Sequence, residues 1–344
     1  MPVTASPRTR VPLSVLDLAP VGVGRTSADA LADTTALARA ADEWGFARFW
    51  VAEHHNMPGV ASTSPAVLIA HLAAVTGRIH VGSGGVMLPN HPPLVVGEQF
   101  AMLEALHPGR IDLGIGRAPG TDPATAAALR RGTDTLSAED FPQHLVDLLG
   151  LLGDIRDGAR LAPRFRATPA PASSPQVWLL GSSGYSAQVA GLLGLPYVYA
   201  HHFGTGHTEE ALALYRQSFR PSRALERPRS MVSVSVLVAG DAEEADDLAG
   251  PARVTMAALR AGRPGPVVTP DQARALLADV PPAQRAALPG VQVLGTADQA
   301  VSALEALVRR TGVDELMVTA TTYDVGPRID TLVALAKHWG QSGD

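Results

Sequence analysis

Short apolar runs alternate with amphipathic helical patterns along almost all of this 344-residue chain. This alternation is typical of βα units, in which each crossover helix returns the chain so that successive strands pair in parallel. Eight runs have the length and composition of buried strands: residues 13–18, 48–53, 79–88, 111–117, 176–181, 196–203, 231–239 and 315–321. The helical patterns between them cover residues 29–44, 65–75, 94–106, 186–193, 208–219 and 297–311. The pattern predicts an α/β fold, a (β/α)8 TIM barrel, with a doubly wound open sheet as the alternative.

Two segments interrupt the alternation. Residues 121–175 contain helical stretches and then the loop LAPRFRATPAPASSP, which leads into the fifth strand. Residues 241–289, between the seventh and eighth strands, are partly helical and contain the loop AGRPGPVVTP. Because the loops that follow the carboxyl ends of barrel strands surround the mouth, residues 241–289 are predicted to be an insertion that forms a lid. No shift in composition divides the chain, so residues 1–344 are predicted to form a single domain.

Composition excludes several kinds of partner and site. Hydrophobic residues make up 46% of the chain and charged residues 18%, which allows a large core. The net charge of -5 gives no electrostatic reason to expect nucleic acid or an anionic membrane as a partner. The absence of cysteine excludes disulfides, thiolate metal ligands and cysteine nucleophiles. Without an apolar N-terminal segment or a run of about 18 apolar residues, the chain is expected to be soluble and cytoplasmic.

The second strand ends in WVAEHHNMPG, where an apolar run stops at Glu53, His54 and His55. In barrel enzymes the catalytic side chains lie at strand ends. Adjacent side chains of an extended segment point to opposite sides, so at most one of the two histidines faces the mouth. A histidine there can accept or donate a proton near neutral pH. Glu53 is a candidate to orient it, or else it makes a structural hydrogen bond at the barrel rim.

The third, fourth and fifth strands end in small and polar residues. Gly84 and Gly85, in GSGGVM, leave room for a flat ligand to approach the backbone closely. Arg117 follows the fourth strand in GIGRAPG. The fifth strand ends in GSSGYSAQ, whose amides and hydroxyls precede a helix and suit an anion, although an ordinary serine-capped helix would have the same sequence. Because Arg117 lies one strand away, a phosphate site is favoured; the loop residues are Gly181, Ser182 and Ser183.

Motifs for metal and dinucleotide binding are missing. Barrel metallohydrolases place His-x-His on one strand, and the sequence has no such pair, so no metal is expected. Neither GVGRTS nor GIGRAPG has the third glycine of a dinucleotide fingerprint. A glycosidase or amidohydrolase barrel would need paired carboxylates or metal ligands at strand ends, and only Glu53 and Asp17 qualify.

The chain resembles the bacterial luciferase-like flavin monooxygenases, most closely the members without bioluminescence. The motifs that carry this resemblance, in order, are WVAEHHNMPG, SGGVMLPNHPPLVVGEQF, LHPGRIDLGIGRAPGTD, LLGSSGYSA and GTADQAVSALEALVRRTGVDELMV. The resemblance covers nearly the whole chain and weakens across residues 241–289. It implies a (β/α)8 barrel that binds reduced FMN supplied by a separate flavin reductase. It further implies that dioxygen and the reduced FMN form a flavin hydroperoxide, which delivers one oxygen atom to an organic substrate.

The resemblance also implies roles for particular residues. His54 matches the catalytic histidine of the family, and Arg117, Ser182 and Ser183 match its phosphate contacts. The pair Gly84–Gly85 matches the place of a non-prolyl cis peptide under the flavin ring, so we expect either a cis peptide or a β-bulge there. With a backbone group facing the ring, Gly85→Val is expected to abolish FMN binding at a smaller cost to the fold.

Substrate, assembly and alternatives are less closely defined by the sequence. Because water destroys a flavin hydroperoxide, the site should be closable and mostly apolar. The resemblance implies pairing through the helices at residues 65–75 and 94–106, and the first of these, PAVLIAHLAAV, is apolar nearly all round, so we expect a homodimer. The alternatives are a deazaflavin-coenzyme-dependent oxidoreductase of the same superfamily and a non-catalytic flavin-binding protein. The candidate substrate-binding residues are Met57, Met87, Tyr185, His202 and Phe203. They suggest an apolar ligand, either aromatic or polyketide-like, as in secondary metabolism.

Overall fold

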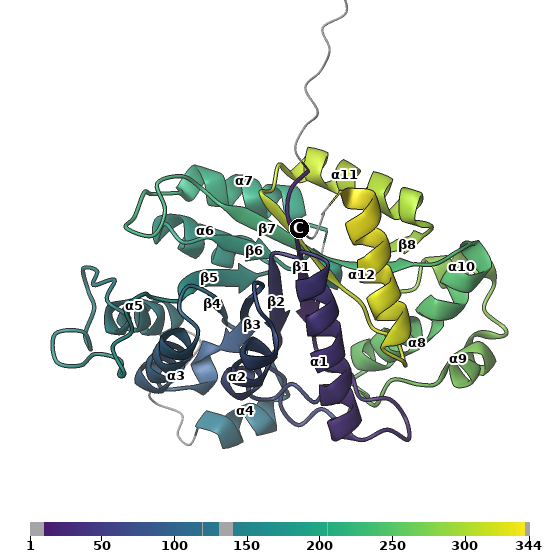
Figure 1. The fold of residues 1–344 in the computed structure, drawn as a ribbon, viewed down its shortest axis with the longest axis horizontal. Coiled ribbons are helices and arrows are strands. Elements are labelled where there is room, and N and C mark those ends of the chain that lie inside the picture. Colours follow the sequence, from purple (N-terminus) through teal and green to yellow (C-terminus); the bar gives the residue numbers. More distant parts are fainter. Residues whose placement is uncertain (1–9, 119, 131–139, 205, 341–344) are drawn as a thin grey trace, which may run out of the picture.

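Eight parallel strands close into a barrel (Figure 1) in the computed structural model, which describes residues 10–118, 120–130, 140–204 and 206–340. The strands follow the order β6-β5-β4-β3-β2-β1-β9-β7, and β6 also pairs with β7, which closes the ring. The predicted (β/α)8 barrel is therefore confirmed, and the open doubly wound sheet is wrong. The barrel strands are β1 (Leu13–Asp17), β2 (Arg48–Val51), β3 (His80–Met87), β4 (Ile111–Gly116), β5 (Gln176–Gly181), β6 (Tyr197–Tyr199), β7 (Ser230–Val238) and β9 (Glu315–Thr319).

Helices surround the barrel and agree with the predicted ranges to within a few residues (Figure 1). A short strand that the sequence pattern did not predict, β8 (Val293–Gly295), pairs with the end of β7 outside the ring. Two 3-10 turns, η1 (Leu88–Asn90) and η2 (His201–Phe203), follow β3 and β6. The helices outside the insertion are α1 (Ser27–Glu43), α2 (Pro65–Val75), α3 (Pro93–Leu106), α4 (Pro123–Arg130), α5 (Phe141–Leu151), α6 (Gly184–Leu192), α7 (Thr208–Ser218), α11 (Ala297–Thr311) and α12 (Gly326–Trp339). Among the described residues, no helix has the combination of length and hydropathy needed to cross a bilayer.

Alternate residues of each strand face two separate apolar regions. Val15 and Phe49 belong to the large cluster between strands and helices. Their neighbours Leu16 and Trp50 belong to a smaller cluster inside the barrel, together with Trp178, Val198, Met231 and Met317. Because side chains alternate along a strand, a shift by one residue would exchange the two sets and bury neither correctly. This alternation fixes which residues reach the interior at the strand ends.

A buried ion network fills the amino-terminal end of the barrel. Arg48 Nη1 lies 2.6 Å from Asp112 Oδ2, and its Nε lies 3.0 Å from Glu315 Oε1. Trp50 Nε1 donates to Asp112 Oδ2 at 2.9 Å. The two carboxylates offset the burial of the guanidinium, and removing one partner of such a network typically costs about 3–5 kcal/mol. The network joins β2, β4 and β9 at the end of the barrel opposite the strand-end motifs.

The insertion between β7 and β9 is mostly helical, with α8 (Ala242–Arg260), α9 (Pro270–Leu277) and α10 (Pro282–Ala286) beside the barrel in Figure 1. Two backbone hydrogen bonds of 2.8 Å attach it to the loop after β1: the N–H of Val267 donates to the carbonyl oxygen of Val21, and the carbonyl oxygen of Val267 accepts from the N–H of Val23. Gly59 has no room for a side chain, because a Cβ there would lie 2.2 Å from the carbonyl oxygen of Gly265. The insertion thus packs closely on loops at the mouth of the barrel.

Candidate active site

A cavity of about 360 Å³ opens at the carboxyl ends of the barrel strands. Every barrel strand contributes lining residues, most of them near or just beyond its carboxyl end, as expected for a barrel enzyme. The inner wall is apolar, with Leu16, Leu180, Val198 and Met317. The insertion completes the wall with residues that the sequence-based site did not include: Ala252, Thr255, Met256, Leu259, Pro264, Gly265 and Val267. Ala252, Met256 and Leu259 lie on α8, where apolar residues resemble those of an ordinary helix face, so the sequence alone did not single them out.

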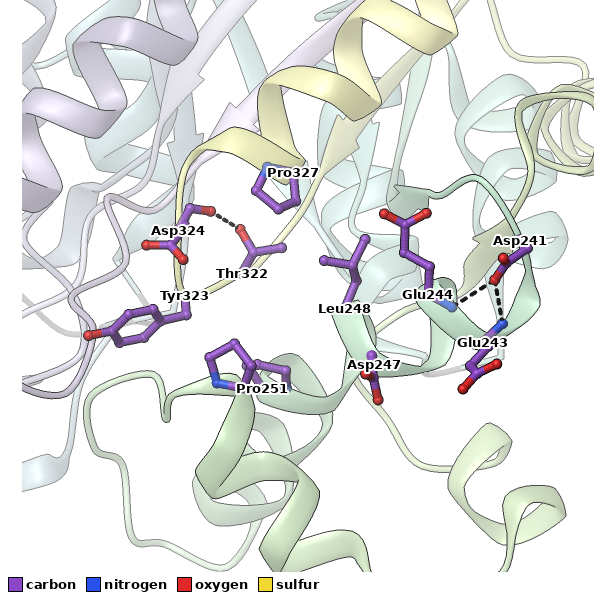
Figure 2. Close-up of a pocket in the computed structure, with 11 residues that line it drawn as sticks. Asp241, Glu243, Glu244, Asp247, Leu248, Pro251, Thr322, Tyr323, Asp324 and Pro327 are labelled. Atoms are coloured by element: carbon purple, nitrogen blue, oxygen red, sulfur yellow. Dashed lines mark hydrogen bonds between the residues drawn. The ribbon is translucent and has the colours of Figure 1, made fainter.

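A second hollow, of about 490 Å³, lies between the start of α8 and the loop after β9 (Figure 2). Its lining includes the carboxylates of Asp241, Glu243, Glu244 and Asp247. Asp241 Oδ1 accepts hydrogen bonds from the backbone N–H groups of Glu243 and Glu244, both at 2.9 Å, and so caps α8. This concentration of negative charge disfavours a phosphate or another anion. The strand-end cavity is therefore the better candidate for an active site.

His54 lies in the wall of the strand-end cavity. Its Nδ1 is 3.1 Å from the carbonyl oxygen of Gly120, and its backbone N–H donates to the carbonyl oxygen of Ser62 at 3.1 Å. Because a carbonyl only accepts, the hydrogen-bond geometry assigns the proton to Nδ1 and leaves a lone pair on Nε2. Burial lowers the pKa of His54, so the ring is neutral near pH 7. The ring is thus held in the state in which it can accept a proton.

Glu53 points away from the cavity and does not orient His54. Its side chain is fully buried, and its Oε1 accepts from Nε2 of His55 and Nε2 of His91, both at 2.8 Å. Its Oε2 accepts from the backbone N–H of Met87 at 3.0 Å. The expected orientation of His54 by Glu53 is therefore wrong, and the structural alternative holds. The reason is the alternation of side chains in an extended segment, which places Glu53 and His55 on one side and His54 on the other.

Gly84 and Gly85 line the same cavity, and the backbone there is irregular. The peptide between them is cis, and the β3–β4 register shifts between Gly84 and Val86. The prediction of a cis peptide or a bulge is confirmed, since both are present. The predicted effect of a side chain at Gly85 is corrected: a Cβ there would lie 2.7 Å from the carbonyl oxygen of Gly114 in β4. It would disrupt the strand pairing and so cost the fold more than we expected.

Arg117, Gly181, Ser182 and Ser183 meet at one end of the cavity. Ser183 is the N-cap residue of α6, yet its hydroxyl makes no capping bond to the helix. The exposed helix N-terminus, this free hydroxyl and the Arg117 guanidinium together match the needs of a phosphate group. The residues present therefore fit the tail of FMN. Gly181 allows the end of β5 to pack closely against α6, because a Cβ there would lie 2.0 Å from Ser186 Oγ.

Four of the five candidate substrate-binding residues line the cavity: Met57, Met87, His202 and Phe203. Tyr185 does not. Its ring lies beneath the Arg117 guanidinium, with the Arg117 Cζ 4.5 Å from the ring centroid. As the second residue of α6, it lies beside the anion-binding end and outside the cavity lining. Nδ1 of His202 lies 2.7 Å from Ser233 Oγ, and burial, with a smaller contribution from His201, lowers the pKa of His202 to about 4.

The fold and this cavity define a (β/α)8-barrel protein with a ligand site at the carboxyl ends of its strands. The chain belongs to the luciferase-like monooxygenase family, whose sequence profile matches residues 11–315. The resemblance inferred from the strand-end motifs is thereby confirmed. Membership supports an oxygenase-type enzyme that depends on a flavin.

Two relatives and one solved structure illustrate this membership. A luciferase-like monooxygenase of Escherichia coli (strain K12) is 41% identical, over 93% of this chain and 94% of its own length. An N-acetyl-S-alkylcysteine monooxygenase of Bacillus subtilis (strain 168) is also 41% identical, over 60% of this chain and 61% of its own length. The crystal structure of apo-MsnO8 has 37% sequence identity and a TM-score of 0.89, over 97% of this chain and 100% of that chain.

Proposed function

We propose that the protein is a monooxygenase that uses reduced FMN and dioxygen to oxygenate a small apolar organic substrate. One observation carries the proposal: a single cavity joins His54 and the Gly84–Gly85 backbone to the Arg117 and Ser183 end. A flat ring at the first place and a phosphate at the second are the two ends of FMN. When bound, reduced FMN with dioxygen supplies the oxygen atom that is transferred.

In this proposal the protein residues position the ligands, move a proton and exclude water. Arg117, Ser182 and Ser183 bind the phosphate, and the backbone at Gly84–Gly85 supports the ring. His54 accepts or donates a proton at Nε2, with Nδ1–H fixed by the carbonyl of Gly120. The chain forms a single barrel domain, and residues 241–289 act as its lid. The apolar side chains of this lid keep water from the reacting atoms.

The proposal includes a separate flavin reductase as a partner. A relative that is the oxygenase component of a flavin-dependent trigonelline monooxygenase of Acinetobacter baylyi, 26% identical over 61% of this chain, supports a reduction step on another protein. Purified protein with FMN and NADH alone is then expected to consume no NADH. Consumption without an added reductase would contradict this part of the proposal.

The whole proposal is tested by anaerobic titration with reduced FMN, followed by ¹⁸O₂ and a panel of apolar thioethers, ketones and arenes. We expect saturable binding of reduced FMN and one ¹⁸O atom in the product. The panel distinguishes hydroxylation, epoxidation and Baeyer–Villiger insertion by the product formed. Tighter binding of a reduced deazaflavin coenzyme, with hydride transfer and no incorporation of ¹⁸O, would replace the proposal with the deazaflavin alternative.

Arg117→Ala tests the position of the phosphate. A charge-assisted contact is worth roughly 1.5–3 kcal/mol, so the variant should bind reduced FMN roughly 10- to 100-fold more weakly. Arg117 is exposed, so the variant should fold normally. Reduced riboflavin, which lacks the phosphate, is the matched ligand and should bind both proteins equally. An equal loss for both flavins would place the phosphate elsewhere.

A further inference from the structure

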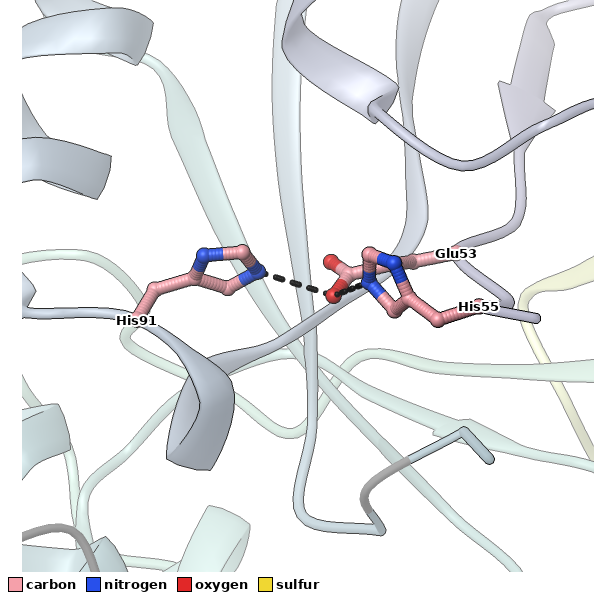
Figure 3. A group of neighbouring side chains, drawn as sticks. All are labelled: Glu53, His55 and His91. Atoms are coloured by element: carbon pink, nitrogen blue, oxygen red, sulfur yellow. Dashed lines mark hydrogen bonds and ion pairs between the residues drawn. The ribbon is translucent and has the colours of Figure 1, made fainter. Parts of the chain in front are cut away.

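Glu53, His55 and His91 converge outside the cavity, between the ends of two neighbouring strands. Glu53 and His55 follow β2, and His91 ends the 3-10 turn η1 after β3. Figure 3 shows both imidazole rings directed at one carboxylate oxygen. Nε2 of each histidine lies 2.8 Å from Glu53 Oε1, and the three ligand atoms lie within 4.8 Å of one another. None of the three residues lines the strand-end cavity.

The surroundings of the cluster leave these atoms available to an ion. Glu53 Oε2 is engaged by the backbone N–H of Met87, which fixes the carboxylate and directs Oε1 at the two rings. The Glu53 side chain is fully buried, whereas the side chains of His55 and His91 are 16% and 32% exposed. The partial exposure of both rings leaves the histidine side of the cluster in contact with solvent, from which water can complete the coordination of an ion. Without an ion, the two Nε2–H groups donate to Oε1 and satisfy the same atoms.

We propose that Glu53, His55 and His91 form a binding site for a divalent transition-metal ion, with Zn²⁺ as the best match. Two imidazole nitrogens and one carboxylate oxygen suit Zn²⁺, whereas Mg²⁺ and Ca²⁺ prefer oxygen ligands alone. Ligand atoms about 2.0–2.2 Å from Zn²⁺ lie roughly 3.0–3.5 Å from one another, so the 2.8 Å contacts need to lengthen by less than about 1 Å.

Binding changes the tautomer of both imidazole rings. Each ring moves its proton from Nε2 to Nδ1, and the Nε2 lone pair then coordinates the ion. No hydrogen bond involves Nδ1 of either ring within the described part of the chain, so both atoms are free to carry the proton. The ion links the segment after β2, which carries His54, to the turn after β3. Its role is structural: it fixes these two segments relative to each other.

The test is Zn²⁺ binding to chelator-treated full-length protein, measured by isothermal titration calorimetry and by the Co²⁺ absorption spectrum. We expect one ion per chain, a higher Tm with Zn²⁺, and visible Co²⁺ bands typical of nitrogen and oxygen ligands. His91→Ala should weaken Zn²⁺ binding at least about tenfold. The matched control is His71→Ala, because His71 is exposed on α2 and hydrogen-bonds Thr35; this variant should bind as the wild type does.

The outcomes separate this site from nonspecific binding. Equal losses in His91→Ala and His71→Ala, or wild-type binding no tighter than that of His91→Ala, would overturn the proposal. His55→Ala is the second variant, in case His91→Ala fails to fold, and it should lose both the Co²⁺ bands and the rise in Tm. These measurements need neither flavin nor substrate, so the result is independent of the proposed monooxygenase activity.

Discussion

Three consecutive residues, Glu53, His54 and His55, face two sides of the barrel wall and serve different purposes. His54 lines the cavity, with Nδ1 bonded to the carbonyl of Gly120. Glu53 and His55 bond each other on the opposite side. The alternation of an extended segment predicts that only one histidine faces inward. It does not identify the partners, because Gly120 and His91 come from other strand ends and meet these residues only in the folded barrel.

His54→Ala tests the inward-facing histidine. General acid–base groups contribute about 10²- to 10⁴-fold, so product formation from the substrate panel should fall by at least about 10²-fold. Binding of reduced FMN should be nearly unchanged, because the proposed support of the ring by the Gly84–Gly85 backbone and the proposed phosphate contacts of Arg117 and Ser183 are retained. His55→Ala is the neighbouring comparison and should cost less, since His55 does not line the cavity. Equal losses in the two variants would contradict the assignment of His54.

His202 makes stability depend on pH. Burial is the main reason that its pKa is about 4 in the folded protein, against 6.5 in an unfolded chain. As the pH falls below 6.5, His202 binds a proton in the unfolded state but not in the folded state. The free energy of unfolding therefore decreases until about pH 4. The full difference corresponds to about 3 kcal/mol. His202→Gln should therefore lose less stability than the wild type between pH 7 and pH 4, as measured by urea denaturation at each pH. Parallel losses in the two proteins would show that His202 is not responsible.

Among the elements, β3 shows the clearest difference between a sequence pattern and its structural meaning. The two glycines predicted an irregular strand that a flat ligand can approach, and the register shift is where we expected it. The sequence could not show where each missing Cβ would point. A Cβ on Gly84 would lie 2.6 Å from Leu16 Cδ1, the end of a flexible side chain that lines the cavity. A Cβ on Gly85 would meet the backbone of β4.

The pair Gly84→Ala and Gly85→Ala separates these two constraints. Leu16 can rotate to admit a methyl group at position 84, so Gly84→Ala should fold with little loss of stability and bind reduced FMN more weakly. At position 85 the neighbour is backbone, so the variant should lose about 1–3 kcal/mol of unfolding free energy. Urea denaturation and flavin titration of both variants provide the check. A stable Gly85→Ala protein, or a more strongly destabilised Gly84→Ala protein, would contradict the geometry.

At the scale of the whole molecule, the βα alternation was sufficient to predict eight barrel strands and their parallel pairing. Eleven of the thirteen site residues predicted at strand ends line the cavity, because each barrel strand contributes to one mouth. The α8 residues that line the cavity, and the contact of His91 with Glu53, were not predicted from the sequence. Both depend on how separate segments pack, and neither leaves a local pattern in the sequence.

The outer surface of α2 and α3 supports the expected homodimer. The two helices pack side by side on the outside of the barrel (Figure 1). Four large apolar side chains on them remain exposed: Val67 at 70%, Val95 at 43%, Met102 at 54% and Leu106 at 62%. Leu68, Ile69 and Leu72 already supply the barrel-facing side of α2. The exposed side chains therefore do not belong to the core of one chain. Contact with a second copy would bury them away from water.

Leu106→Arg tests this surface, with Leu276→Arg as its matched control. Both leucines are 62% exposed, but Leu276 lies on α9 in the insertion, away from α2 and α3. In a twofold dimer both copies use the same surface, so Leu106→Arg places one charge from each copy in the interface. Removing these charges from water in an apolar contact is unfavourable. We expect light scattering at micromolar concentration to give a dimer for the wild type and Leu276→Arg. Leu106→Arg should shift toward the monomer at the same concentration and keep its far-ultraviolet circular dichroism spectrum. A monomeric wild type would contradict the proposed dimer. If Leu276→Arg dissociated the dimer and Leu106→Arg did not, the interface would instead lie on the insertion.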